Sequence, residues 1–113
     1  MKRGDIYRVS LDPTARHEQS ASRPVLVVLA TAFNLATKLP IVLPITNSGD
    51  FARRLGFAVP LSGIQTTGVV HCDQPRVLDL ATFHASLVEA LPAPILDKVL
   101  AKVITSFEER QAD

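Results

Sequence analysis

The chain has 113 residues, enough to bury one core and too few for two, so residues 1–113 are expected to form a single domain. Lys and Arg number 12 against 11 Asp and Glu, which excludes a global charge that attracts nucleic acid or membranes, so any nucleic-acid site must be local. The one cysteine excludes an internal disulfide and fits a cytoplasmic location, no apolar run is long enough to span a membrane, and the N-terminus lacks the pattern of a signal peptide.

The first half of the chain predicts three strands and one long loop. Residues 4–11 alternate apolar and polar side chains, and residues 24–30 form a short β-branched run typical of a strand buried on both faces. The polar segment 12–23 between them is expected to be a loop that is either functional or disordered. Residues 31–34 are expected to turn the chain, and residues 39–46 form another apolar run whose prolines favour an edge or a bent strand.

The second half predicts further short strands and then a helix. Strands are expected at residues 56–61, 68–73 and 76–80, separated by turn residues. After Pro94, which suits the first turn of a helix, apolar residues recur with helical period at Ile95, Leu96, Val99, Leu100, Val103, Ile104 and Phe107. The sequence therefore predicts a mainly antiparallel β domain closed by one C-terminal α-helix that packs on the sheet.

The segment 68–79 gathers the most reactive side chains. In a strand, successive side chains alternate between faces, which predicts His71 and Asp73 on one face and Val70 and Cys72 toward the core. A His and an Asp on an exposed strand are more often solvated than catalytic. A thiol nucleophile at Cys72 is excluded, because its side chain and that of His71 point to opposite faces, so a small buried hydrophobe is expected.

Cleavage of RNA by its own 2′-hydroxyl needs a base, an acid and positive charge at the phosphate. Asp73, His71 and an arginine can supply these groups. Arg23, at the exit of the polar loop, and Arg76, just past Pro75, are the arginines considered, although Arg23 can equally anchor a salt bridge. This route needs no metal, and neither a carboxylate cluster nor a zinc-type Cys/His spacing is present, so no cofactor is expected.

The chain resembles the MazF/PemK/Kid family of toxins from bacterial toxin–antitoxin systems, and within it the PemK/Kid branch. The resemblance covers nearly the whole sequence. The segments that carry it, in order and spacing, are Arg3–Ile6, Ser10–Ala15, His17–Gln19, Arg23–Leu26, Ala32–Asn34, Phe51–Arg53, Gly56–Val59, Thr66–Val70 and Cys72–Arg76.

This resemblance implies an SH3-like barrel of antiparallel strands with a C-terminal helix, working as a homodimer. It also implies a metal-independent, ribosome-independent endoribonuclease that cuts single-stranded mRNA and leaves a 2′,3′-cyclic phosphate and a 5′-hydroxyl. The implied partners are single-stranded RNA and a cognate antitoxin protein. DNA is implied only indirectly, through a complex with the antitoxin.

The resemblance further implies roles for individual residues. Asp73 matches the general base of the branch, and Thr46 matches a threonine that contacts the scissile region. The other matched positions are the loop-exit arginine Arg23, His17 and Glu18 in the loop that covers the site, and Phe57, Thr67 and Val69 along the RNA path.

The sequence departs from the branch at several of these positions. His71 stands where relatives have an arginine that acts as acid and phosphate clamp, and Asn47 stands where relatives often have serine. Histidine can act as a general acid near neutral pH but is a poorer permanent cation than arginine. The resemblance therefore implies that Arg76 or Arg23 takes up the phosphate charge, or that the enzyme is slower.

Two alternatives differ from this function. CcdB-like toxins share the fold and bind gyrase without catalysis, but they depend on a C-terminal segment containing tryptophan, and this chain has no Trp. The second alternative is a relative with little activity, marked by His71 and Asn47, that binds RNA or antitoxin.

Overall fold

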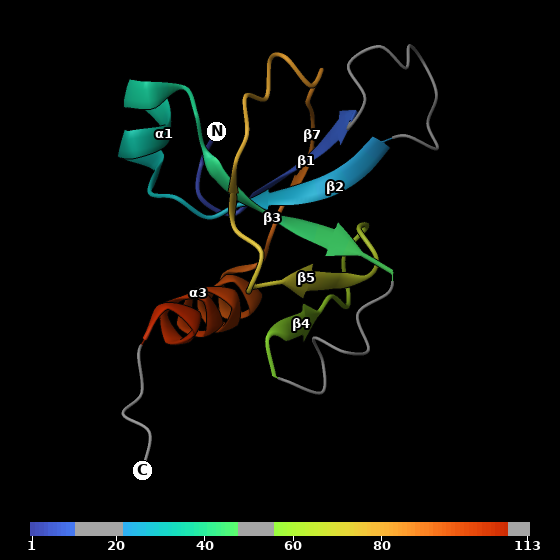
Figure 1. Ribbon diagram of the computed structural model, residues 1–113. Coiled ribbons are helices and arrows are strands. Elements are labelled where there is room, and N and C mark those ends of the chain that lie inside the picture. The colour runs from blue at the N-terminus through green and yellow to red at the C-terminus, as the bar shows by residue number, and fades with distance from the viewer. Residues whose placement is uncertain (11–21, 48–55, 109–113) are drawn as a thin grey trace.

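The computed structural model describes residues 1–10, 22–47 and 56–108. Figure 1 shows strands gathered in the middle of the molecule, with both helices to the left of the strands in this view. Along the chain the elements are β1 (Asp5–Ser10), β2 (Ser22–Val27), α1 (Thr31–Thr37), β3 (Ile41–Thr46), β4 (Ala58–Pro60), β5 (Val69–His71), β6 (Arg76–Val77), β7 (Ser86–Ala90) and α3 (Ala93–Phe107).

The strands pair into one antiparallel sheet. Its order is β4-β5-β3-β2-β1-β7, and β6 also pairs with β3. Strand β1 lies between β2 and β7, with Ile6 opposite Leu26 on one side and Glu89 on the other. The prediction of a mainly antiparallel β fold with a C-terminal helix is confirmed.

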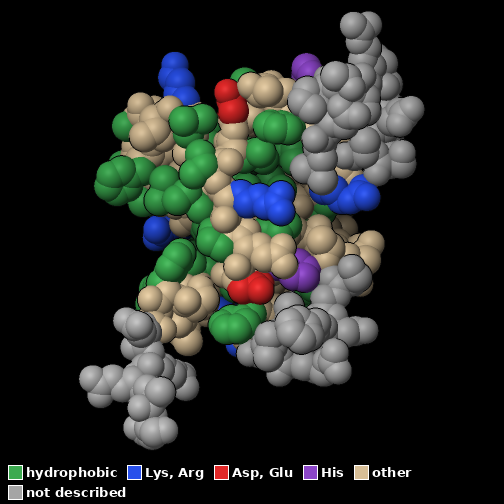
Figure 2. Space-filling model, viewed as in Figure 1, with side chains coloured by type: hydrophobic (Ala, Val, Ile, Leu, Met, Phe, Trp, Pro, Cys, Tyr) green, Lys and Arg blue, Asp and Glu red, His purple; other side chains and the backbone are tan. Residues whose placement is uncertain are grey.

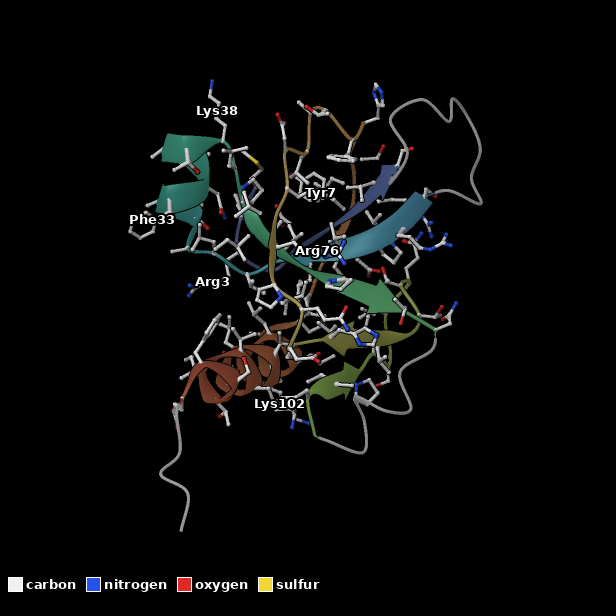
Figure 3. The ribbon with its side chains drawn as sticks, in the orientation of Figure 1. Arg3, Tyr7, Phe33, Lys38, Arg76 and Lys102 are labelled. Atoms are coloured by element: carbon white, nitrogen blue, oxygen red, sulfur yellow. The ribbon has the colours of Figure 1, made fainter. Side chains whose placement is uncertain are left out.

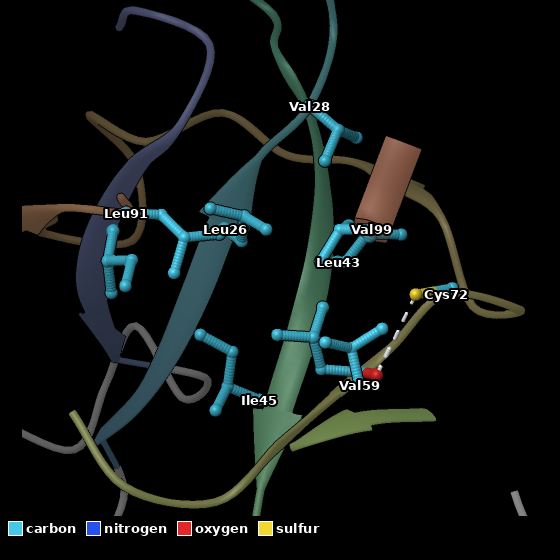
Figure 4. Packing of buried hydrophobic residues seen from close by; sticks show 10 residues of the cluster. Leu26, Val28, Leu43, Ile45, Val59, Cys72, Leu91 and Val99 are labelled. Carbon is cyan, nitrogen blue, oxygen red and sulfur yellow. Dashed lines mark hydrogen bonds between the residues drawn. The ribbon is translucent and has the colours of Figure 1, made fainter. Parts of the chain in front are cut away.

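Apolar side chains are buried on both faces of the sheet. One core cluster contains Leu26 and Leu43 together with Val99 of α3 (Figure 4). A second cluster contains Val25, Val27, Val42 and Leu80. Successive residues of β2 thus belong to different cores, which confirms the expectation that this strand is buried on both faces. Each fully buried side chain of this kind contributes about 1.5–3 kcal/mol.

Strand β3 is central, so the edge position, one of the two alternatives predicted for residues 39–46, is wrong. It pairs with β2 along one side and with β5 and β6 along the other. On the second side, β6 pairs with Ile41 and Val42 and β5 pairs with Ile45 and Thr46. Pro44 falls between these two ladders, where its missing N–H costs no hydrogen bond to β5 or β6.

Residues 31–34 begin the helix α1, so the predicted turn there is also wrong. The helix is only seven residues long, too short for a clear apolar period. Its buried side chain is Asn34, whose Nδ2 donates to the carbonyl oxygens of Met1 (3.0 Å) and Leu29 (2.8 Å). Phe33 and Leu35 are exposed, and hydrophobic side chains gather over α1 in Figure 2.

Several predicted strands are shorter in the structure. The predicted strand 68–73 ends at His71, because Cys72 and Asp73 turn and the N–H of Gln74 donates to the carbonyl of His71 (3.3 Å). Strand alternation, which predicted His71 and Asp73 on one face, therefore does not extend to Asp73. Strand β7 has no counterpart among the predicted strands, since three of its five residues are exposed and its apolar pattern is weak.

The C-terminal helix matches its prediction closely. Proline occupies its first turn, and Val99 is fully buried in the core against the sheet. Toward its end, Ile104 and Phe107 are 61% and 73% exposed, so the stripe leaves the core there. Among the described residues, no helix is long and apolar enough to cross a membrane.

Candidate active site

A groove of about 810 Å³, here called the polar groove, opens where β1, β2 and β3 approach the loop between β4 and β5. Most of its lining is hydroxyl, amide and guanidinium groups, which hydrogen-bond a ligand and also stay solvated without one. The described residues that line it are Arg8, Ser22, Arg23, Pro24, Ile45, Thr46, Asn47, Gln65, Thr66, Thr67 and Val88. Of the predicted site residues, the structure therefore brings together Arg23, Thr46, Asn47 and Thr67.

A hydrogen bond joins the groove to the histidine singled out from the sequence. Thr46 is the last residue of β3, and its Oγ1 lies 2.7 Å from Nε2 of His71, the last residue of β5. The imidazole is only 7% exposed, so the expectation of a solvated strand-surface histidine is wrong. His71 lies behind Thr46 and reaches the groove through the threonine hydroxyl.

Gly68 allows β5 to approach β3 at this point. Its φ of +118° is rarely adopted by other residues, and a Cβ added there would lie 2.5 Å from the carbonyl oxygen of Thr46 and 3.3 Å from Oδ1 of Asn47. Any side chain at this position would therefore displace two groove residues. The glycine places Thr67, which precedes it, beside the ends of β3.

Glu89 of β7 anchors the opposite wall of the groove. Its Oε2 accepts hydrogen bonds from the N–H (2.7 Å) and the hydroxyl (2.6 Å) of Thr66, and its Oε1 accepts from the N–H of Gln65 (3.2 Å). These donors stabilise the carboxylate, the Thr66 hydroxyl most strongly, and lower the pKa of Glu89. The segment that carries Thr67 is thus tied to the sheet by a charged group.

Two arginines line the groove from neighbouring strands. Nη1 of Arg8 donates to Oγ (3.0 Å) and to the carbonyl oxygen (3.4 Å) of Ser22, and Nη1 of Arg23 donates to the same carbonyl (2.9 Å). Arg8 was not among the predicted site residues. The available signal was a charged side chain two residues after Ile6, at a position where strand alternation favours an apolar residue.

The remaining predicted residues lie elsewhere. Asp73 is exposed in the turn after β5, Phe57 is half-buried just before β4, and Val69 is 5% exposed in a small cluster with Ala58. The carbonyl of Phe57 accepts a hydrogen bond from the N–H of Cys72 (3.0 Å), which links this segment to the turn that carries Asp73. His17 and Glu18 lie outside the described residues. So do Leu11, the last residue of the first predicted strand, and residues 51–53, which carry part of the family resemblance.

Arg76 lines a second groove, here called the apolar groove, with a volume of about 390 Å³. Figure 3 shows Arg76 near the middle of the viewed face and Arg3 toward α1. Apart from these arginines, the described lining is apolar and comes mainly from α3 and the strands beside it: Val28, Leu29, Ile41, Pro75, Val77, Leu100, Val103, Ile104 and Phe107. The two arginines considered from the sequence, Arg23 and Arg76, thus belong to different grooves.

Cys72 is fully buried, as expected from the sequence. Its thiol donates to the carbonyl of Val70 (3.9 Å), and burial raises the pKa of Cys72 to about 11 despite the nearby charge of Lys102. The thiol therefore stays protonated and unreactive. The described residues contain no group of three or more His, Cys, Asp and Glu side chains that could hold a metal ion.

Residues 2–107 match the family model described as PemK-like, MazF-like toxin of type II toxin-antitoxin system. The chain is 52% identical over 107 residues to Endoribonuclease PemK from Escherichia coli (93% of this chain, 80% of the relative) and 44% identical over 93 residues to Endoribonuclease toxin ChpB from Escherichia coli strain K12 (80% and 77%). It is also similar to MazF in the crystal structure of MazE-MazF (Form-II) from Deinococcus radiodurans, with a TM-score of 0.78, 30% identity and 93% of each chain covered. The chain therefore belongs to the PemK-like, MazF-like family of toxins of type II toxin–antitoxin systems.

Proposed function

We propose that this toxin is an endoribonuclease that cuts single-stranded mRNA without a metal and so inhibits translation and growth. Two relatives that share 52% and 44% of their aligned residues with this chain are named endoribonucleases. The observation that carries the proposal is the polar groove itself, in which Thr46, hydrogen-bonded to His71, lies on the same open surface as Arg23. Hydroxyl, imidazole and guanidinium groups together fit a phosphodiester.

In the proposed reaction, the carboxylate of Asp73 takes the proton of the 2′-hydroxyl, and the 2′-oxygen forms a bond to phosphorus. The bond from phosphorus to the 5′-oxygen breaks, and that oxygen leaves with a proton. The products are a 2′,3′-cyclic phosphate and a 5′-hydroxyl. Arg23 stabilises the negative charge that develops on the phosphate. The exposed position of Asp73 leaves its carboxylate open to a ligand.

His71 supplies the proton for the 5′-oxygen through Thr46. A protonated imidazole carries donors only, so Nε2 donates to the Thr46 hydroxyl oxygen 2.7 Å away. As the 5′-oxygen leaves, the hydroxyl gives up its own proton and takes one from the imidazole. This relay gives a buried histidine access to a substrate in the groove.

The substrate-binding roles fall to the residues near this reaction centre. Asn47 and Thr67 line the polar groove and can hydrogen-bond bases or sugar hydroxyls. Phe57, half-buried before β4, can stack on a base, while Val69 supports the floor from beneath because it is buried. Arg76 is proposed to contact the RNA only where the RNA extends beyond the polar groove. His17 and Glu18, in the segment 12–23, are the remaining proposed substrate-binding residues.

The proposed partners are an antitoxin protein and a second copy of the chain, all in the cytoplasm, with DNA reached only through the antitoxin complex. The structural relative from Deinococcus radiodurans was solved with MazE. The exposed Ile104 and Phe107 beside the apolar groove offer a surface for a homodimer. Light scattering that finds only monomers at micromolar concentration would contradict the homodimer.

The experiment that tests the function is end-mapping of RNA fragments made by the purified protein in excess chelator. The expected result is cleavage with 2′,3′-cyclic phosphate and 5′-hydroxyl ends, and an Asp73→Ala variant is expected to lose activity by about 10²–10⁴-fold. Asp97→Ala, which removes the same charge from the exposed face of α3, is the matched control. Equal cleavage by the Asp73→Ala variant would refute the mechanism, and toxicity without RNA cleavage would favour a non-catalytic gyrase-binding or RNA-binding toxin.

A further inference from the structure

We propose that Arg8 is a second phosphate-binding residue of the polar groove, which clamps the RNA backbone together with Arg23. This inference rests on the proposed function, because the phosphate is that of the RNA substrate. It goes beyond the residues implied by the family resemblance, among which Arg8 has no role. Three features of the structure carry it: the position of Arg8, its pairing with Arg23, and the charge of the groove.

Arg8 projects into the groove from a strand that is paired on both sides. Strand β1 pairs on both sides, with Arg8 opposite Pro24 of β2 and Ser86 of β7. The side chain is exposed and its Nη1 is oriented by the two oxygen atoms of Ser22. Within the described part of the chain, Nε and Nη2 make no hydrogen bond, so their N–H groups point to a ligand or to water.

Ser22 draws the two guanidinium groups together. Nη1 of Arg8 and Nη1 of Arg23 both donate to its carbonyl oxygen, at 3.4 Å and 2.9 Å. Two guanidinium groups that share one acceptor are held close enough for one anion to bind both. Arginine forks match phosphate oxygens in geometry as well as in charge.

The described lining of the groove carries charge of one sign. Its described lining contains Arg8 and Arg23 and no Asp or Glu. Glu89, behind the wall, already accepts three hydrogen bonds from Thr66 and Gln65. The groove therefore favours an anion, and a single-stranded RNA presents one at every nucleotide.

Arg8 also provides the cation that His71 does not. His71 is buried behind Thr46, and Arg76 lines the apolar groove, so neither gives the polar groove a second permanent charge. With Arg8 present, two arginines line the same groove as Thr46. Arg8 thereby compensates, within the groove, for the histidine at position 71, where the resemblance implies an arginine in relatives.

The test is the salt dependence of RNA binding by Arg8→Gln, measured with a single-stranded RNA carrying 2′-O-methyl groups throughout so that it cannot be cleaved. One lost phosphate contact lowers the magnitude of the slope of log K against log salt by about 0.7. We expect this change together with an affinity loss of about tenfold at low salt. Arg8→Lys keeps the charge and is expected to keep the slope.

Lys98→Gln is the matched control, because it removes one positive charge from an exposed position of α3 that lines none of the grooves described above. It is expected to bind like the wild type, and equal melting temperatures show that the variants fold. An Arg8→Gln variant with an unchanged slope overturns the inference, whether or not its affinity falls. Cleavage by the wild type is measured separately. Binding without cleavage would reject the proposed function, and the salt slope of Arg8→Gln would still decide whether Arg8 binds phosphate.

Discussion

Among the described residues, two arginines line the polar groove and two line the apolar groove, but the side chains around each pair differ. In the polar groove, Arg8 and Arg23 share Ser22 and lie among threonines and an asparagine. In the apolar groove, Arg3 and Arg76 border the exposed end of α3. Here Nε of Arg3 donates to the carbonyl of Val28 (2.9 Å) and so fastens the N-terminal segment to the sheet.

The difference shows that the surroundings of an arginine decide what it can do. A cation among polar groups without a carboxylate attracts an anion, whereas a cation at the rim of an apolar surface keeps that surface hydrated and orients what packs on it. The polar groove thus has the character of a substrate site, and the apolar groove that of a protein interface. Substitutions in each groove can test this distinction.

The largest effect is expected from His71, which is hydrogen-bonded to Thr46 of the polar groove. His71→Gln removes the proton donor and is expected to lower cleavage by about 10²-fold or more while RNA binding is kept. Single-turnover cleavage and binding of an uncleavable RNA, measured side by side, check this prediction, and equal losses of the two would contradict it.

The relay gives this prediction a second test. Thr46→Val removes the hydroxyl that lies 2.7 Å from Nε2 but keeps the β-branched shape in β3. If the proton passes through Thr46, this variant loses activity to a similar degree, and adding His71→Gln lowers it little further. Fully additive losses would show that the two residues act independently.

A smaller effect separates the two grooves directly. Arg23→Gln and Arg76→Gln remove the same charge from each groove in turn. We expect Arg23→Gln to weaken binding of an uncleavable RNA by about tenfold at low salt, and Arg76→Gln to weaken it much less. The measurement is a binding titration at several salt concentrations, and equal losses in the two variants would contradict the distinction.

Much of this architecture could be predicted from the sequence, because apolar periodicity reports burial. The β-branched run in β2 and the stripe of α3 both lie where expected, and the family is confirmed by the matches over residues 2–107. Helix α1 and strand β7 could not be predicted in the same way. The first is short and buries an asparagine, and the second leaves most of its side chains exposed.

The site was harder to predict, since it depends on contacts between strands that are distant in the sequence. Strand alternation put His71 on a solvated face, but in the structure Val69 to His71 are all buried between β3 and β4. Arg8 and Arg23 meet only through the register of β1 with β2. No spacing in the sequence reveals a shared hydrogen-bond acceptor of this kind.

The smallest expected effect comes from Glu89, which holds the wall of the polar groove without lining it. The hydrogen bonds from Thr66 to Glu89 need the ionised carboxylate, and the pKa of Glu89 is lowered. Their contribution is therefore complete above the ordinary pKa of 4.5 and is lost as the pH falls through the lowered pKa. Glu89→Gln should therefore mimic acid at neutral pH, and we expect RNA affinity to fall by about threefold because the pair is partly exposed.

Nuclear magnetic resonance can follow this hold through the amide of Thr66, whose N–H lies 2.7 Å from Oε2 of Glu89. Its chemical shift should titrate with a midpoint below 4.5, and the step should vanish in Glu89→Gln. Glu108→Gln removes an exposed carboxylate just past α3 and should leave the step unchanged. A midpoint at or above 4.5 would mean that Glu89 does not hold the wall as a carboxylate.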